Sequence, residues 1–339
     1  MHSMSRRKVA IITGGNSGIG YALAERLLAD HDNIRLCLAC RSRERAEKAA
    51  AKLQKLSADA EISIVILDTS NVQSVYSAAR DIEQRYDHID WLYLNAGMLK
   101  VKGVDWSNFW EGLFSKRVLF MFTTGEGLLI QEDGVTDDGL QKVFQTNVFG
   151  HYVLIKELEA KLGNMSGNGE AVSQLIWTSS SASLEYNFDI EDFQHKKGKD
   201  PYSSSKYATD VLSVGLNNRM NKQNVYSHVM CPGLVMSNLT YEILPQWFWV
   251  LVLPFLWLMR LCVPTMTNSA SNGSEALVWL SHQDPSQLDP QSKFQSSVTA
   301  CGKPYVETTK MNIDHNKVET LMQKLDSLDA DLRKKYKNA

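Results

Sequence analysis

The sequence predicts an α/β fold in which helices cover both faces of a doubly wound parallel sheet. Two observations support this prediction. Short apolar runs alternate with longer segments of helical periodicity over most of the 339 residues, which is the pattern of strand–helix–strand units. The first apolar run ends in a glycine-rich turn that leads directly into a helical segment. A chain of this length could form two domains, but no linker divides it, so we expect a single domain over residues 1–339.

Each expected strand is a short apolar run, and each expected helix follows from its periodicity or composition. Leucines recur at helical spacing after the glycine turn, and the next helical segment is rich in Ala, Glu, Lys and Arg. The expected elements are strand 8–13, helix 21–30, strand 34–40, helix 41–56, strand 62–67, helix 74–86, strand 91–94, helix 139–162, strand 173–178, a helix around Tyr202 and strand 226–231.

Two segments interrupt this alternation, and one helix follows it. Residues 100–134 are longer than an ordinary strand-to-helix connection and rich in aromatic side chains, so we interpret them as an insertion that covers an apolar site. The second interruption, 241–264, is strongly apolar. Residues 313–337 read as a charged amphipathic helix, which we expect to pack onto its own domain.

Acidic and basic residues nearly balance: 38 Asp and Glu against 36 Lys and Arg, a formal net charge of −2. Nucleic-acid-binding proteins usually carry a basic tract or face, so no nucleic-acid partner is expected. The five cysteines are few and odd in number, which indicates a reducing compartment rather than a disulfide framework. Cys37 and Cys40 lie three apart on a strand and so face opposite ways. The eight histidines show no metal-ligand spacing, and we expect no metal.

A glycine-rich turn, G-x3-G-x-G, follows the first strand. Glycines let backbone N–H groups approach a pyrophosphate closely, and the helix that follows adds favourable charge at its N-terminus. Because the spacing is wider than the general G-x-G-x-x-G fingerprint, an ordinary tight turn stays open as the alternative. The residues expected to bind a dinucleotide here are Thr13, Gly14, Asn16, Ser17, Gly18, Ile19 and Gly20.

The end of the second strand indicates which dinucleotide is bound. A carboxylate at this position favours the ribose hydroxyl of NAD, whereas arginine favours the 2′-phosphate of NADP. This chain has Arg41, followed by Arg43. We predict NADPH as the cofactor and Arg41 as its phosphate ligand. The alternative for Arg41 is a solvated residue at the start of a helix. For Arg43 this is the better interpretation.

Tyr202 and Lys206 lie four apart in DPYSSSKYATD and therefore share one face of the expected helix. An ammonium beside a phenol stabilises phenolate, so the pKa of the phenol should fall below its usual value of about 10. Such a phenol can protonate a ketone oxygen during reduction. We predict Tyr202 as the proton donor and Lys206 as its partner; a core tyrosine and a solvated lysine are the alternatives.

Ordered motifs over residues 8–240 resemble those of the short-chain dehydrogenase/reductases: the glycine turn, N-A-G, T-N-V, T-S-S, Y-x3-K and P-G. The resemblance implies a Rossmann-like fold and a reductase whose hydride comes from C4 of nicotinamide. It also implies that Ser180 hydrogen-bonds the substrate carbonyl and that Asn147, in a distorted helix, anchors a water linking Lys206 to solvent. The further cofactor contacts it implies are Asp68, Asn95, Ala96, Gly97, Tyr202, Lys206 and Ser237.

One departure from the family pattern concerns the segment between Ser180 and Tyr202, which is longer than the family commonly shows. The extra residues, EYNFDIEDFQHKKGKD, must loop away for the two hydroxyls to meet. Alignment with the family's strand end favours Ser180 over Ser179 and Ser181. A capping or turn role is the alternative for Asn147, Asp68 and Ser237.

The apolar segment 241–264 contains the unbroken run Trp247–Met259. With its flanks, from Ile243 to Val263, the run approaches the roughly 20 residues that span a bilayer, and its tryptophans suit a membrane interface. We interpret the segment as a membrane attachment that also opens the substrate pocket to lipid. A buried core helix or a dimer interface is the alternative.

Within the family, long stretches such as GLQKVFQTNVFGHYVLIKELE and EDFQHKKGKDPYSSSKYATD resemble reductases of sterol and steroid ketones. This implies reduction of the 3-ketone of 4-methyl sterol intermediates on the way to cholesterol, and of the 17-ketone of estrone. It further implies a place at the endoplasmic-reticulum membrane with the active site facing the cytosol, and a homodimer or a complex of sterol-pathway enzymes. Reduction of retinal or another lipid carbonyl, and an NADP-sensing scaffold without activity, are the alternatives.

Overall fold

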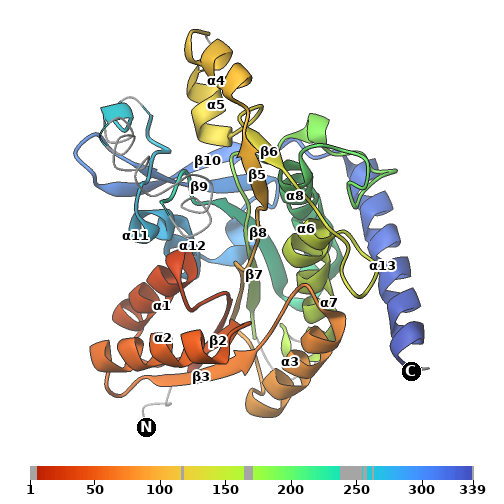
Figure 1. Ribbon diagram of the computed structural model, residues 1–339. Coiled ribbons are helices and arrows are strands. Elements are labelled where there is room, and N and C mark those ends of the chain that lie inside the picture. The colour runs from red at the N-terminus through yellow and green to blue at the C-terminus, as the bar shows by residue number, and fades with distance from the viewer. Residues whose placement is uncertain are drawn as a thin grey trace.

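The computed structural model describes residues 6–115, 118–163, 171–236, 254, 258–261 and 263–337. Its main sheet consists of β1 (Lys8–Thr13), β2 (Ile34–Cys40), β3 (Glu61–Ile66), β4 (Trp91–Leu94), β7 (Ser173–Thr178), β8 (Val225–Cys231), β9 (Ser292–Val298) and β10 (Pro304–Lys310). The strand order is β10-β9-β8-β7-β4-β1-β2-β3, and only β10 runs antiparallel to its neighbour (Figure 1). The predicted doubly wound, single-domain α/β fold is confirmed, and every predicted strand forms within one residue of its expected limits.

Helices pack on both faces of this sheet and form one hydrophobic core on each side. One core lies under α1, α2 and α12, and the other under α3, α7 and α8 (Figure 1). The helices are α1 (Gly18–Asp30), α2 (Arg43–Leu56), α3 (Val72–Arg85), α6 (Lys142–Phe144), α7 (Gly150–Glu157), α8 (Pro201–Met220), α11 (Ala270–Gly273), α12 (Glu275–Ser281) and α13 (His315–Lys337), with shorter 3-10 turns at Glu159–Lys161, Glu185–Asn187, Asn221–Gln223 and Pro285–Gln287.

The helix predicted at 139–162 begins later than expected and is not uniform. Gly139 adopts a φ of +88°, and its turn is closed by the N–H of Thr136, which donates to Leu140 O at 2.9 Å. The left-handed conformation at Gly139 excludes it from a helix. Between α6 and α7 the chain forms a π-helical turn over Gln145–Phe149, a feature that often marks functional sites.

The insertion at 100–134 is a β-hairpin with two helices between its strands. β5 (Val101–Val104) pairs with β6 (Leu129–Gln131), and α4 (Trp106–Leu113) and α5 (Val118–Thr124) lie between them. The hairpin projects from the body beyond the sheet (Figure 1). Trp106, Trp110 and Phe114 are 48%, 56% and 85% exposed. These three side chains are exposed, and the covering role of the insertion stays a prediction.

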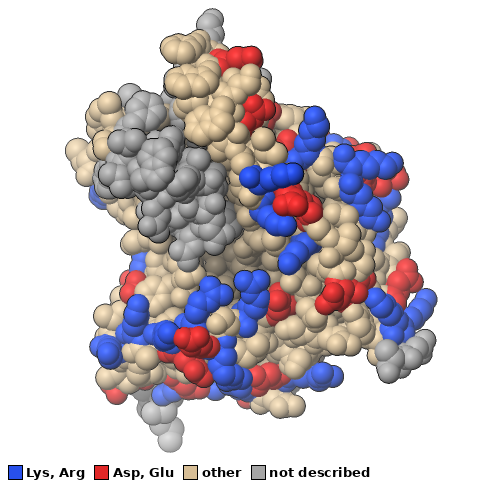
Figure 2. Space-filling model, in the orientation of Figure 1, with Lys and Arg blue, Asp and Glu red and all other residues tan. Residues whose placement is uncertain are grey.

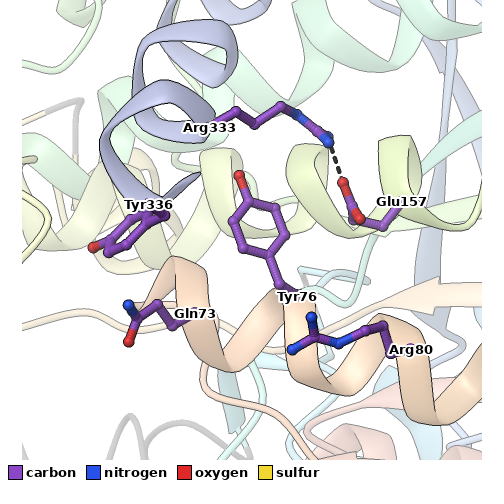
Figure 3. Close-up of a pocket in the computed structure, with 6 residues that line it drawn as sticks. All are labelled: Gln73, Tyr76, Arg80, Glu157, Arg333 and Tyr336. Carbon is purple, nitrogen blue, oxygen red and sulfur yellow. Dashed lines mark ion pairs between the residues drawn. The ribbon is translucent and has the colours of Figure 1, made fainter. Parts of the chain in front are cut away.

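The C-terminal helix α13 packs against α8, as predicted. Its inward side chains Leu321, Met322 and Leu325 belong to the core, and Asp326 forms an ion pair with Arg219 of α8 at 2.6 Å. A cavity of about 440 Å³ lies between α3, α7 and α13 (Figure 3). Its lining residues are Gln73, Tyr76, Arg80, Glu157, Arg333 and Tyr336, none of which is a predicted site residue.

Most of the apolar segment 241–264, and Ser237 before it, lie outside the described residues. Among the residues of this segment that the structure does describe, Leu258 and Leu261 are exposed and Met259 is buried. Within the described part of the chain, no helix combines the length and apolar character needed to cross a membrane.

Candidate functional site

The glycine turn lies at the carboxyl end of β1, next to the carboxyl end of β4. These two strands are neighbours in the middle of the sheet, while the chain from β1 proceeds outward to β2 and β3. Ligands of doubly wound folds bind where the strand order reverses in this way. Figure 2 shows a hollow in the middle of the surface that faces the viewer. It lies above α1 and α2 and below the projecting hairpin, and Lys and Arg side chains lie on its border.

The geometry of the turn requires glycine and suits a dinucleotide. Gly14 and Gly18 have φ values of +69° and +55°. A Cβ on Gly20 would lie 2.6 Å from both Gly14 O and Asn95 Nδ2, closer than any real contact. Ser17, at the N-cap of α1, gives no side-chain hydrogen bond to the first turn, so the helix lacks the side-chain cap that would satisfy its free N–H groups. These N–H groups, beside a glycine backbone, fit a pyrophosphate.

Thr13 and Asn95 join the ends of β1 and β4. Thr13 Oγ1 accepts hydrogen bonds from the N–H groups of Asn95 and Ala96, each at 2.9 Å, and lies 3.0 Å from His151 Nε2. Asn95 Nδ2 donates to Thr13 O at 3.0 Å. Thr13 was predicted as a cofactor ligand, but these contacts show that its hydroxyl ties together the two loops that frame the site.

Asn147 lies in the π-helical turn and fixes the segment after Gly97. Its Oδ1 accepts from Met98 N at 2.8 Å, and its Nδ2 donates to Met98 O at 3.0 Å and to Ser205 Oγ at 2.9 Å. The helix distortion predicted at Asn147 is present. Its side chain thus connects the carboxyl end of β4 to α8, which carries Tyr202.

Tyr202 and Ser180 come together although they lie far apart in the sequence. Burial raises the pKa of Tyr202 to about 12, and the Ser180 side chain offsets part of this effect by lowering the pKa. The N–H of Tyr202 donates to Gln131 Oε1 at 3.0 Å, and Gln131 Nε2 donates to Asp200 Oδ1 at 3.2 Å. The last residue of the projecting hairpin therefore caps the first turn of α8.

Lys206 is buried, with a relative exposure of 5%. Its Nζ donates to Thr178 O at 2.7 Å and lies 5.5 Å from the centre of the Tyr202 ring. Burial lowers the pKa of Lys206 to about 8. The predicted fall in the Tyr202 pKa is therefore wrong for this arrangement, because desolvation of the phenol dominates and the ammonium is bound to a carbonyl instead.

The long segment between Ser180 and Tyr202 folds along α8. Asn187 Nδ2 donates to Ser203 Oγ at 3.0 Å, and Ser183 Oγ donates to Asp210 Oδ2. The segment leaves the Ser180 side chain near enough to the Tyr202 phenol to lower its pKa.

The remaining predicted residues occupy positions around the turn. Arg41 follows β2 directly and is exposed, and Arg43 begins α2 as an exposed residue 4.0 Å from Glu47. Asp68 Oδ1 accepts from Ser70 N at 2.9 Å and from Ser70 Oγ at 2.7 Å, which are the contacts of a turn aspartate. Ser237 lies outside the described residues.

Among the described residues, no group of three or more His, Cys, Asp and Glu side chains is arranged to hold a metal ion. Cys37 and Cys40 are both buried, and burial raises the pKa of each thiol to about 11. Both thiols are therefore protonated near neutral pH and unreactive.

Sequence reasoning missed four polar residues around the site. Asp210 lies one helical turn beyond Lys206 and His151 one turn beyond Asn147, so their spacing could have revealed them. Gln131 and Lys293 come from elements whose connection to the site no sequence pattern indicates. Lys293 Nζ lies 2.5 Å from Asp210 Oδ2 and 3.4 Å from Ser180 O.

Comparison with known proteins matches residues 8–247 to the family model described as short chain dehydrogenase. The chain is 49% identical over 327 residues to a Homo sapiens protein named 3-keto-steroid reductase/17-beta-hydroxysteroid dehydrogenase 7, covering 96% of this chain and 95% of that one. A Schizosaccharomyces pombe 3-keto-steroid reductase is 32% identical, covering 91% of this chain and 92% of the relative. Among solved structures, a Pseudomonas aeruginosa RhlG/NADP complex has a TM-score of 0.59 at 19% identity, covering 89% of this chain and 99% of that one.

Proposed function

The chain belongs to the short chain dehydrogenase family, and from that premise we propose that it is an NADPH-dependent reductase of sterol 3-ketones. Its substrates are the 4-methyl 3-ketosterols of cholesterol synthesis, of the zymosterone type, and the 17-ketone of estrone. The observation that carries ketone reduction is the position of the Tyr202 phenol beside the buried Lys206, whose Nζ lies 5.5 Å from the centre of the phenol ring and donates to Thr178 O. The names of relatives that match nearly the whole chain support the substrate class.

The chemistry divides between the cofactor and three side chains. Nicotinamide supplies the hydride that reaches the carbonyl carbon. Tyr202, fully protonated at neutral pH with a pKa of about 12, gives its proton to the oxygen that gains negative charge. Ser180 donates a hydrogen bond to the same oxygen. Lys206 places a positive charge beside the phenol as phenolate forms.

The preference for NADPH is proposed from Arg41, which is exposed and directly follows β2, the strand that pairs with β1 up to Thr13. Arg41→Asp is expected to weaken NADPH binding about tenfold or more, since a charge-assisted hydrogen bond contributes roughly 1.5–3 kcal/mol, and to favour NADH. Arg43→Asp changes an exposed residue whose guanidinium lies 4.0 Å from Glu47. It serves as the matched control and should leave both affinities unchanged. Fluorescence titration of each dinucleotide measures the effect. If Arg41→Asp preferred NADPH over NADH as strongly as the wild type does, Arg41 would not bind the 2′-phosphate.

A ketone panel tests the substrate proposal. Purified protein with NADPH is assayed against zymosterone, estrone and retinal, with hydroxyl products identified by mass spectrometry. Reduction of zymosterone and estrone is the expected result. Turnover of retinal alone would favour the alternative lipid-carbonyl reductase, and NADPH binding with no turnover on any ketone would favour a sensing scaffold.

Attachment to the endoplasmic-reticulum membrane is proposed from the sequence 241–264 and from the lipid character of the substrate. The exposed Leu258 and Leu261 at its end support this. Deletion of residues 243–263 is expected to shift the protein from the floating to the soluble fraction in liposome flotation. Retained NADPH binding serves as the control for folding. A deleted protein that floats as the wild type does would place the attachment elsewhere.

A further inference from the structure

A buried ion pair lies beneath the catalytic centre and joins β9 to α8. Lys293 Nζ and Asp210 Oδ2 are 2.5 Å apart, and their side chains are only 13% and 3% exposed. The ammonium also approaches Ser180 O at 3.4 Å, and Ser183 Oγ donates to the same carboxylate oxygen. The pair therefore holds both ends of the turn 180–183.

Stability alone does not account for such a pair. Removing two charges from water costs more than their attraction commonly returns, so apolar residues of similar volume usually stabilise a protein as well or better. Asp210 Oδ1 is buried and has no hydrogen-bond partner, so the carboxylate is not fully satisfied. The arrangement fits a role in fixing geometry better than a role in holding the fold together.

We propose that Lys293 and Asp210 are positioning residues that fix the turn 180–183, and with it the Ser180 hydroxyl, against the helix that carries Tyr202 and Lys206. This inference rests on the proposed ketone reduction. Within the turn, Ser180 Oγ accepts from Ala182 N at 3.1 Å, and Ser181 Oγ donates outside it to Thr123 O at 2.7 Å. Because a misplacement of about 1 Å can cost 10²-fold in rate, the turn needs an anchor outside its own backbone.

The pair also acts on the pKa of Lys206. Burial lowers this pKa most, the Asp210 carboxylate raises it, and the Lys293 ammonium lowers it further. Cys231 on β8 faces the same group and raises its pKa, as it does that of Tyr202. Activity that needs the Lys206 ammonium should decline as pH rises through about 8.

The first test separates positioning from stability. The double variant Lys293→Met/Asp210→Leu removes both charges and leaves neither unpaired. We expect an unfolding temperature equal to or above that of wild type, a kcat about 10- to 100-fold lower, and a KM for NADPH within about twofold. A folded double variant with wild-type kcat would overturn the proposal.

A second pair of variants removes no charge and so tests the turn without a folding risk. Ser183→Ala removes only the hydroxyl between the turn and Asp210 and should lower kcat severalfold. Ser203→Ala removes a buried hydroxyl on α8, which accepts from Asn187, and should leave kcat unchanged. Equal kcat in the two variants would contradict the anchoring role of Asp210.

The pH profile of kcat gives a readout that a purely structural pair would not change. Asp210→Asn removes the charge that raises the Lys206 pKa, so the decline should move to lower pH. Lys293→Gln removes the charge that lowers it, so the decline should move to higher pH. If both variants moved the decline in kcat to the same side, or did not move it, the proposed effect of the pair on the Lys206 pKa would be refuted.

The outcomes also separate this inference from the proposed function. If the wild type reduced no ketone, the proposed function would be refuted, and this inference with it. If the wild type were active and the variants matched it, the inference alone would be refuted.

Discussion

Tyr202→Phe is expected to lower kcat for ketone reduction by about 10²-fold or more, the usual contribution of a positioned general acid. The phenol is the group placed to protonate the substrate oxygen, and its pKa of about 12 keeps it protonated over the whole working range. NADPH affinity should change little, because the ring, which lies 5.5 Å from Lys206 Nζ, remains. Steady-state kinetics on zymosterone or estrone, with a separate NADPH titration, measure both quantities.

Tyr207→Phe is the matched control for this experiment. Tyr207 is the neighbouring buried tyrosine on α8, and its ring packs against Phe188, with Lys317 of α13 nearby. Loss of its hydroxyl should leave kcat within about twofold of wild type, since it touches none of the reacting groups. If both variants kept wild-type turnover, Tyr202 would not be the proton donor.

The strands were predictable because a parallel strand covered on both faces must be apolar along its whole length. In β2, for example, all residues except Arg35 are buried. The ordered motifs were equally readable, since Tyr202 and Lys206 need a fixed helical spacing to meet. Chemistry carried by neighbouring residues on one element can therefore be inferred from sequence alone.

The strands β9 and β10 escaped prediction for a physical reason. β9 reads SKFQSSV, yet Ser292, Ser296 and Ser297 are buried. Their hydroxyls have hydrogen-bond partners outside β9. Ser296 Oγ, for instance, donates to Gly273 O at 3.0 Å and accepts from Ala276 N at 3.0 Å. A strand buried through hydrogen-bonded serines shows no hydrophobic pattern, and Lys293 remained hidden with it.

The electrostatics of the site could not be predicted either. Sequence spacing places an ammonium near a phenol, but it does not reveal how deeply each is buried or that Lys206 is bound to Thr178 O. Burial moved the Tyr202 pKa upward where proximity alone suggested a fall. The contribution of the projecting hairpin, through Gln131 to the first turn of α8, likewise depends on tertiary contact.

Gly20→Ala is expected to weaken NADPH binding by about 10- to 100-fold and to lower the unfolding temperature. The added Cβ would lie 2.6 Å from Gly14 O and from Asn95 Nδ2, so either the start of α1 or the Asn95 side chain must move. Overpacking of this kind costs about 1–3 kcal/mol, and each 1.4 kcal/mol is about tenfold in affinity. Movement of Asn95 would also break its bond to Thr13 O and loosen both loops that frame the site.

Gly103→Ala provides the control, because a Cβ at this glycine in β5 meets nothing within 4 Å. It should bind NADPH as the wild type does and unfold at the same temperature. Titration calorimetry and thermal unfolding, each with and without NADPH, distinguish the two variants. A Gly20→Ala protein with wild-type affinity would mean that the cofactor does not approach the backbone at this turn, and the dinucleotide site would have to lie elsewhere.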